Sequence, residues 1–217
     1  MTAAPKTPWE IAPREEGCEF DLPTKASVCS WSKNKAVLKW RQEDGRGIEV
    51  TATVSLDKTK PMSYWDIELT SFEGDKLMEV YFPRISNIKE FTNEEVAIAP
   101  WTGHLYKNYR KVSNVLSQRS VIRPTMQVEV IYGEEPSGLY IATNDVNSMA
   151  KGSYFEFEGN TTTYKHVYML PMSAENSSFS SSYQSIIGTL HGDWYDAAQI
   201  YREWAWQQEW VKNNRLH

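Results

Sequence analysis

The sequence predicts a mostly β protein, an antiparallel β-sandwich followed by a C-terminal amphipathic α-helix. Short segments that alternate apolar and polar residues recur along most of the chain, with turn residues between them. No strand–helix–strand alternation is present, which excludes a Rossmann fold or a complete (β/α)8 barrel. Only the last segment, from Asp193 onward, places apolar residues at the three- and four-residue spacing of a helix.

The strand pattern is found in eight segments separated by turn signals. We expect strands at 48–56, 64–69, 77–82, 126–132, 139–143, 154–158, 165–170 and 185–191. A turn at 72–75 predicts that the second and third of these form a hairpin, which Pro83 ends. A turn at 133–138 likewise pairs the fourth with the fifth. Residues 84–118 show little alternation and predict a long loop region.

The chain divides into three expected parts. Residues 1–17, rich in Pro and charge, predict an irregular arm; 18–191 form the sandwich, and 192–217 a C-terminal linker helix. Asp193 is a suitable N-cap, Asp196 suits the positive end of the helix dipole, and the helix is expected to run to about Trp210. Its apolar stripe consists of Trp194, Ala197, Ala198, Tyr201, Trp204 and Ala205.

The helix also carries a family resemblance. The segment from Gly192 to Ala205, GDWYDAAQIYREWA, resembles the lead into the catalytic barrel of bacterial α-galactosidase-like glycoside hydrolases. The segments 64–69, 77–83 and 138–145 resemble, in the same order, strands of the galactose-mutarotase-like β-supersandwich that precedes that barrel. The resemblance therefore implies an N-terminal β-supersandwich domain of a glycoside hydrolase.

The resemblance has consequences for function and partners. In that family the catalytic carboxylates belong to the barrel, so the isolated chain, which stops at His217, is expected to lack glycosidase activity. Its partner would be the missing barrel of the same polypeptide, with Trp194, Tyr201 and Trp204 packing at the interdomain helix. Without the barrel, part of this apolar stripe would be exposed or would drive homodimerisation.

A sugar-contacting surface is the second functional hypothesis. The chain has 9 Trp and 12 Tyr, which fit either a large core or rings that stack on the apolar faces of sugars. The aromatic loop after Pro100 supplies the candidates: Trp101 for stacking, with Tyr106 beside it, and His104 or Arg84 for hydrogen bonds to hydroxyl groups. A free-standing carbohydrate-binding module would use the same residues.

An aldose-epimerase-like enzyme is the third hypothesis, because ring opening needs a histidine and a carboxylate around one sugar. His104 is its candidate; His166 and His191 fall in expected strands, and His217 is terminal. A glycosidase would need paired carboxylates. The pairs Asp66 with Glu68 and Asp193 with Asp196 are instead explained by a solvent-facing strand and by helix capping, which leaves no catalytic residue assigned.

Composition excludes several other classes. The net charge of −5 leaves no basic excess for nucleic acid, and no segment is long and apolar enough for a membrane span or signal peptide. The compartment, cytoplasmic or secreted, stays open, as does a bond between Cys18 and Cys29. No metal-ligand spacing, phosphate loop or Gly-x-Ser-x-Gly motif occurs, so we expect no metal and no cofactor.

Overall fold

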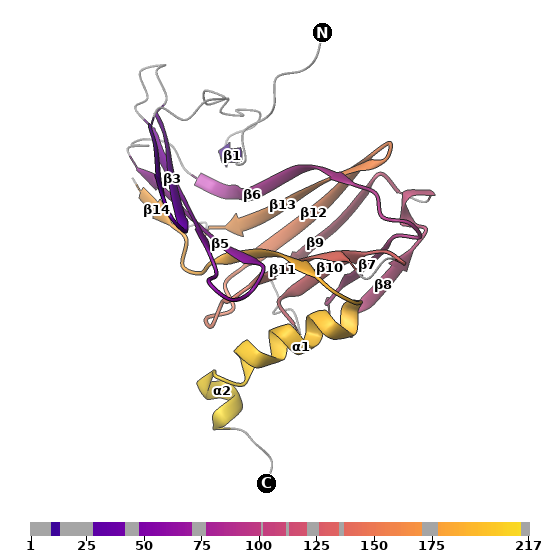
Figure 1. Cartoon of the computed structure of the whole chain (residues 1–217). Helices are drawn as coiled ribbons and strands as arrows, with labels where there is room; N and C mark the ends of the chain where they lie inside the picture. Colours follow the sequence, from indigo (N-terminus) through magenta and orange to yellow (C-terminus); the bar gives the residue numbers. More distant parts are fainter. Residues whose placement is uncertain are drawn as a thin grey trace.

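The computed structural model describes residues 10–13, 28–41, 48–70, 77–100, 102–111, 113–120, 126–134, 137–170 and 178–213. Within these ranges the protein is a sandwich of two antiparallel sheets with a helix on the outside of the larger one (Figure 1). The predicted fold class is therefore confirmed.

The smaller sheet has five strands in the order β1 (Glu10–Pro13), β6 (Leu77–Lys89), β13 (Thr161–Met169), β12 (Lys151–Glu158) and β9 (Val115–Ser120). The larger sheet has the order β2 (Val28–Ser32), β3 (Lys35–Arg41), β4 (Glu49–Leu56), β5 (Met62–Thr70), β15 (Ser185–Leu190), β11 (Gly138–Thr143), β10 (Val128–Tyr132), β7 (Glu95–Ile98) and β8 (His104–Lys107), while β14 (Ser178–Ser180) pairs with β5.

The apolar core has three parts. Two clusters fill the space between the sheets; their fully buried members include Leu69, Phe82 and Phe155. The third lies on the opposite face of the larger sheet, where α1 (Trp194–Ala205) covers β10 and β11. Both faces of the central strands are consequently buried, so β10 shows the burial pattern of a core strand rather than of a half-exposed one.

All eight expected strands are present, but the predicted hairpin from 64 to 82 is wrong. β5 pairs with β4 and β15 in the larger sheet, whereas β6 pairs with β1 and β13 in the smaller one. The two strands are thus consecutive in sequence and lie in different layers. Their alternation is the same in either arrangement, because each has one face toward the shared core.

Pro83 does not end its strand as predicted. β6 continues to Lys89 through a cis Phe82–Pro83 peptide, and its register with β13 shifts between Lys165 and Val167. Proline has no backbone N–H to donate to a neighbouring strand. At a register shift one residue is left out of the hydrogen-bond ladder, so the missing N–H is tolerated there.

The predicted loop region at 84–118 is also wrong. It contains the end of β6, the hairpin of β7 and β8, a 3-10 turn η1 (Tyr109–Lys111) and β9. These strands are short, four residues in β7 and β8, so the alternation is too brief to stand out. Within the predicted irregular arm, Glu10–Pro13 forms β1.

The C-terminal helix begins as predicted. The side chain of Asp193 accepts a hydrogen bond from the backbone N–H of Tyr195 (2.7 Å), and Asp196 accepts one from the backbone of Asp193 (3.0 Å), a reciprocal capping box. The helix ends at Ala205 rather than near Trp210, and a separate turn, α2 (Glu209–Lys212), follows. None of the described helices is long and apolar enough to cross a membrane.

Candidate functional site

The predicted sugar-contact residues are only partly brought together. His104 begins β8, the outermost strand of the larger sheet, and is exposed, while Tyr106 on the same strand is half-buried. The Nδ1 atom of His104 lies 3.1 Å from the hydroxyl oxygen of Tyr106, and the rings meet edge to face. Trp101 lies outside the described residues. Arg84 is on β6 of the smaller sheet, opposite Lys165, and is therefore not part of this pair.

The register of the larger sheet connects His104 with a buried carboxylate. His104 is opposite Ile98 of β7, and Ile98 is opposite Glu129 of β10. Side chains on one cross-strand row point to the same face, so His104 and Glu129 both face the smaller sheet. Two strand spacings, about 10 Å, separate them. Ile98 fills the interval, so the two do not form an acid–base pair.

A small cavity of about 40 Å³, lined by both apolar and polar residues, lies between the two sheets. Its walls come from β10 and β11 on one side and from β12 and β13 on the other, with Met126 and Gln127 at the approach to β10. The polar side chains that line it are Gln127, Glu129, Thr143, Lys151, Ser153, Tyr164 and His166. Four ionisable residues, Glu129, Lys151, Tyr164 and His166, thus line one cavity, which we call the interior pocket.

Glu129 is the most perturbed acid of the interior pocket. Its Oε1 atom accepts a hydrogen bond from the hydroxyl of Ser153, while Oε2 is buried and has no hydrogen-bond partner among the described residues. Burial raises the pKa of the Glu129 carboxyl to about 7, an effect that the Ser153 bond only partly opposes. A pKa of about 7 leaves this carboxyl partly protonated at neutral pH.

Lys151 supplies a buried positive charge in the interior pocket. Its ammonium pairs with Asp145 and donates to the amide oxygen of Gln127 at 2.9 Å. It also lies 4.3 Å from the centre of the Tyr183 ring. Burial lowers the pKa of Lys151, and the Asp145 carboxylate counteracts this shift. The pair is nearly fully enclosed, so removing either partner would leave an uncompensated buried charge.

His166 completes the interior pocket as a neutral ring. Its Nε2 lies 2.9 Å from the hydroxyl oxygen of Tyr183. Burial, with a smaller contribution from the Lys151 charge, lowers the pKa of His166 to about 3. An imidazole with this pKa cannot supply a proton near neutral pH, so His166 positions its neighbours instead. This agrees with the prediction that it is an ordinary sheet residue.

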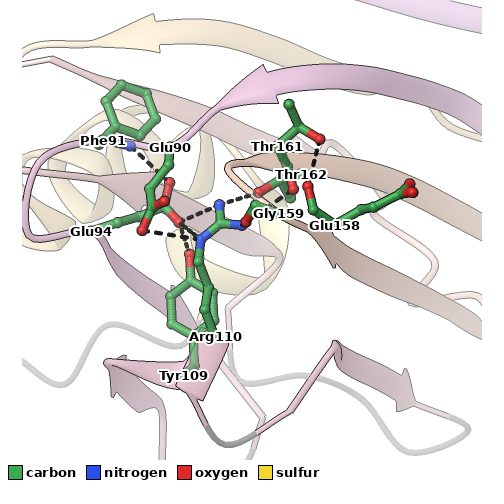
Figure 2. A network of polar contacts seen from close by, with 9 residues as sticks. All are labelled: Glu90, Phe91, Glu94, Tyr109, Arg110, Glu158, Gly159, Thr161 and Thr162. Carbon is green, nitrogen blue, oxygen red and sulfur yellow. Dashed lines mark hydrogen bonds and ion pairs between the residues drawn. The ribbon is translucent and has the colours of Figure 1, made fainter.

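A second polar network anchors the loops at the other end of the sandwich (Figure 2). The guanidinium of Arg110, in η1, donates to Glu94 Oε1 through Nη2 (2.8 Å) and Nε (3.0 Å). It also donates to Thr162 Oγ1 (2.7 Å) and to the backbone oxygen of Thr161 (3.2 Å). Glu94 in turn accepts from the backbone N–H of Phe91 at 3.1 Å. Arg110 thus joins three turns through one planar fork.

The Arg110 network is structural in character. The buried Tyr109 donates to Glu94, and burial together with the Glu94 charge raises the pKa of the Tyr109 hydroxyl well above its ordinary value. The guanidinium carbon of Arg110 lies 4.9 Å from the centre of the Phe157 ring. The network fixes η1 after the β7–β8 hairpin and thereby holds the strand that carries His104.

The predicted interdomain aromatic residues differ in exposure. Tyr201 is buried against the larger sheet and Trp204 is half-buried beside it, but Trp194 is 48% exposed. Other large exposed side chains lie on this segment: Tyr195, Trp206 and Trp210. Arg202 lies 4.0 Å over the Trp206 ring. The stripe spacing correctly placed Ala197, Tyr201 and Ala205 on the buried face, but it also included the exposed Trp194. It did not identify the other exposed aromatic residues of this segment.

The cysteines, the possible metal ligands and the paired carboxylates were the other chemical features of the sequence. Cys18 lies outside them, so a bond to Cys29 stays untested. Among the described residues no group of three or more His, Cys, Asp or Glu could hold a metal. Asp66 accepts a hydrogen bond from Gln184, and Asp193 with Asp196 forms the expected capping box.

Local sequence patterns do not predict the interior pocket. Glu129 alternates with apolar residues in β10, a pattern that is typical of a strand with one solvent-facing side. Ile131, fully buried on the same face, was the only local signal that this face is covered. Lys151 carries no signal, because a lysine at the start of a strand is normally exposed.

Comparison with known proteins supports the fold. Residues 179–217 match a family described as a domain of unknown function (DUF6259). No curated protein matches the sequence.

Solved structures of glycoside hydrolases are similar over most of the chain. The GH36 α-galactosidase AgaA of Geobacillus stearothermophilus, in complex with raffinose, is 11% identical with a TM-score of 0.58, covering 93% of this chain and 32% of that one. The α-N-acetylgalactosaminidase NagBb of Bifidobacterium bifidum is 10% identical with a TM-score of 0.65, covering 96% and 34%. An α-galactosidase of Lactobacillus brevis is 9% identical with a TM-score of 0.59, covering 92% and 31%.

This chain spans about a third of the length of these enzymes. At this identity the likeness establishes the fold. The predicted resemblance to the β-sandwich domain of α-galactosidase-like glycoside hydrolases is therefore confirmed at the level of the fold.

Proposed function

We propose that this chain is the non-catalytic β-sandwich domain of a carbohydrate-active enzyme, in which it supports a (β/α)8 catalytic barrel that follows in the same polypeptide. The observation that carries the proposal is the fold match, which takes in more than nine-tenths of this chain but only about a third of each matched glycoside hydrolase. The remaining two-thirds of such an enzyme would hold the catalytic carboxylates.

The C-terminal segment supports the same function. Trp194, Tyr195, Trp206 and Trp210 are each between 42% and 57% exposed, although α1 already buries Tyr201 and Ala205 on the sandwich. Exposed tryptophans gathered on one short segment are costly in water and are typical of a covered interface. In the proposed enzyme the barrel packs against this aromatic set, which makes α1 the junction between the two domains.

The reading frame and the activity of its product test this proposal together. The codons after position 217 are expected to encode alternating strands and helices that include two carboxylates suited to glycoside hydrolysis. The longer protein should cleave aryl α-glycosides, while the chain described here should not. A stop codon directly after position 217, or equal hydrolysis by the isolated chain, would sink the proposal.

The exposed aromatic set gives a separate test on the isolated chain. We expect self-association that weakens when Trp206 and Trp210 are replaced by serine, measured by sedimentation velocity. Replacing the exposed Trp31, which lies at the far edge of the larger sheet, is the matched control. Equal sedimentation of all three proteins would argue against a cohesive surface on this segment.

Direct sugar contact is the second candidate function, and the exposed pair of His104 and Tyr106 favours it. An edge-strand imidazole bonded to a phenol offers hydrogen-bonding groups beside a ring face. Calorimetric titration with a panel of oligosaccharides tests it, with His104→Ala and Trp101→Ala as variants. An absence of heat with every sugar, and no change in either variant, would remove this candidate.

A further inference from the structure

The interior pocket contains a hydrogen-bond acceptor that the fold leaves unused. Oε2 of Glu129 is fully buried and lacks a partner among the described residues, although Oε1 of the same carboxyl is bonded to Ser153. Buried polar atoms are nearly always paired, since an unpaired one loses its hydrogen bonds to water without replacing them. The cavity of about 40 Å³ adjoins this carboxyl. The cavity and the unused acceptor therefore point to an occupant that donates a hydrogen bond.

The charges around the cavity favour a neutral occupant. A cation would approach the Lys151 ammonium, which also lines the cavity, and an anion would approach Glu129. Lys151 is already committed to Asp145 and Gln127, so it does not offer a free site to an acid. Moving an ion of either sign from water into a low-dielectric interior is costly unless the ion is paired there. A neutral hydroxyl group meets neither objection.

The size and the apolar walls narrow the chemistry further. A cavity of about 40 Å³ is several times smaller than an engineered core cavity of roughly 150 Å³ that admits benzene. It suits a group of two or three heavy atoms. Val128, Ile141 and Ala142 provide apolar contact beside the hydroxyl of Ser153 and the carboxyl of Glu129. A methylene group that carries a hydroxyl matches both kinds of wall.

We infer that the interior pocket binds a primary alcohol group, –CH2OH, whose hydroxyl donates to Oε2 of Glu129. The group belongs either to a small free alcohol or to the hydroxymethyl arm of a sugar. This inference is independent of the proposed function, because it concerns the sandwich alone. No bond is made or broken in the binding.

Binding of the alcohol is coupled to the ionisation of Glu129, and this coupling can be measured. A hydroxyl that donates to the carboxylate stabilises its charged form, so binding lowers the pKa of Glu129 from its raised value of about 7. Binding therefore strengthens as the pH rises through neutrality, and it releases a proton. An alcohol that only stabilises the protein surface has no such effect on one buried carboxyl.

The experiment follows the carbon-13 signal of the Glu129 carboxyl in the whole chain as the pH is varied. The signal is assigned through the backbone and checked with Glu129→Gln. The probes are ethylene glycol and methyl α-D-galactopyranoside; 1,2-dimethoxyethane, which has no hydroxyl donor, is the control. The exposed carboxyl of Glu209 in the same spectra reports any general solvent effect.

The expected result is a fall of at least about half a pH unit in the Glu129 midpoint, a roughly threefold change in its dissociation constant. A shift with ethylene glycol identifies a small alcohol, and a shift with the galactoside alone identifies a sugar arm. If neither probe moves Glu129 more than Glu209, or if dimethoxyethane moves it equally, the inference is overturned and the pocket holds water only. Ser153→Ala, which retains Oε2, should keep the ligand-induced shift.

Discussion

Replacing Glu129 by glutamine should remove a large pH dependence of folding. The folded-state pKa of Glu129 is raised by burial from 4.5 to about 7. A group with a raised folded pKa favours the folded state below its unfolded pKa, and this contribution is lost as the pH rises through the folded pKa. The wild-type protein should therefore lose stability between about pH 4.5 and pH 7, where the unfolded chain ionises more readily than the folded one.

The size of the effect follows from the shift. The difference between 4.5 and about 7 corresponds to about 3 kcal/mol at about 1.4 kcal/mol per pH unit. Because a part is already lost at pH 5, about 2.5 kcal/mol separates pH 5 from pH 9. With a urea m-value of about 2 kcal/mol/M, the difference in midpoint between wild type and Glu129→Gln should change by about 1 M across this range.

Urea unfolding at several pH values, followed by tryptophan fluorescence, measures this difference. Other titrating groups contribute equally to both proteins and cancel in the comparison. Glu209→Gln, at an exposed position on α2, should follow the wild type at every pH. The reasoning is refuted if the stability difference between wild type and Glu129→Gln is the same at pH 5 and pH 9.

Three further substitutions test the framework around the site. Arg110→Met should cost about 3–5 kcal/mol in urea unfolding, because it leaves the buried Glu94 carboxylate without its cation; a loss below about 1 kcal/mol would contradict the anchoring role. Asp193→Ala should lower stability by about 1 kcal/mol, with a loss of far-ultraviolet helix signal, since it removes the N-cap; an unchanged spectrum and midpoint would contradict the capping. Gly188→Ala should lower the melting temperature, because a Cβ there would lie 2.1 Å from Sδ of Met62 and 2.7 Å from a backbone oxygen; a melting temperature equal to that of wild type would contradict this packing.

The hairpin of β10 and β11 shows where local pattern was sufficient. Its turn residues join the end of β10 directly to the start of β11, so the turn itself brings the two strands side by side. The predicted hairpin of β5 and β6 shows where it was not. The same alternation and the same kind of turn signal precede a strand that joins the other sheet. Alternation specifies which face of a strand is apolar, but it does not specify which other strand it pairs with.

The candidate sites also differ in how far apart their residues lie in the sequence. His104 and Tyr106 were selected from one loop, and their contact is local, across two residues of one strand. The interior pocket instead draws on four strands from two sheets, which span residues 126–166 in sequence. Its polar residues carried no common spacing that could have linked them in advance.

The sequence by itself determined the β class, the eight expected strands and the capped start of α1, because each depends on residues within a few positions of one another. Only the tertiary structure decided that α1 covers one face of β10 while the smaller sheet covers the other. That second covering encloses the carboxyl of Glu129, whose Oε2 is buried, and this burial raises its pKa. The physical reason is that desolvation depends on everything packed around a group, which the order of residues along one strand does not specify.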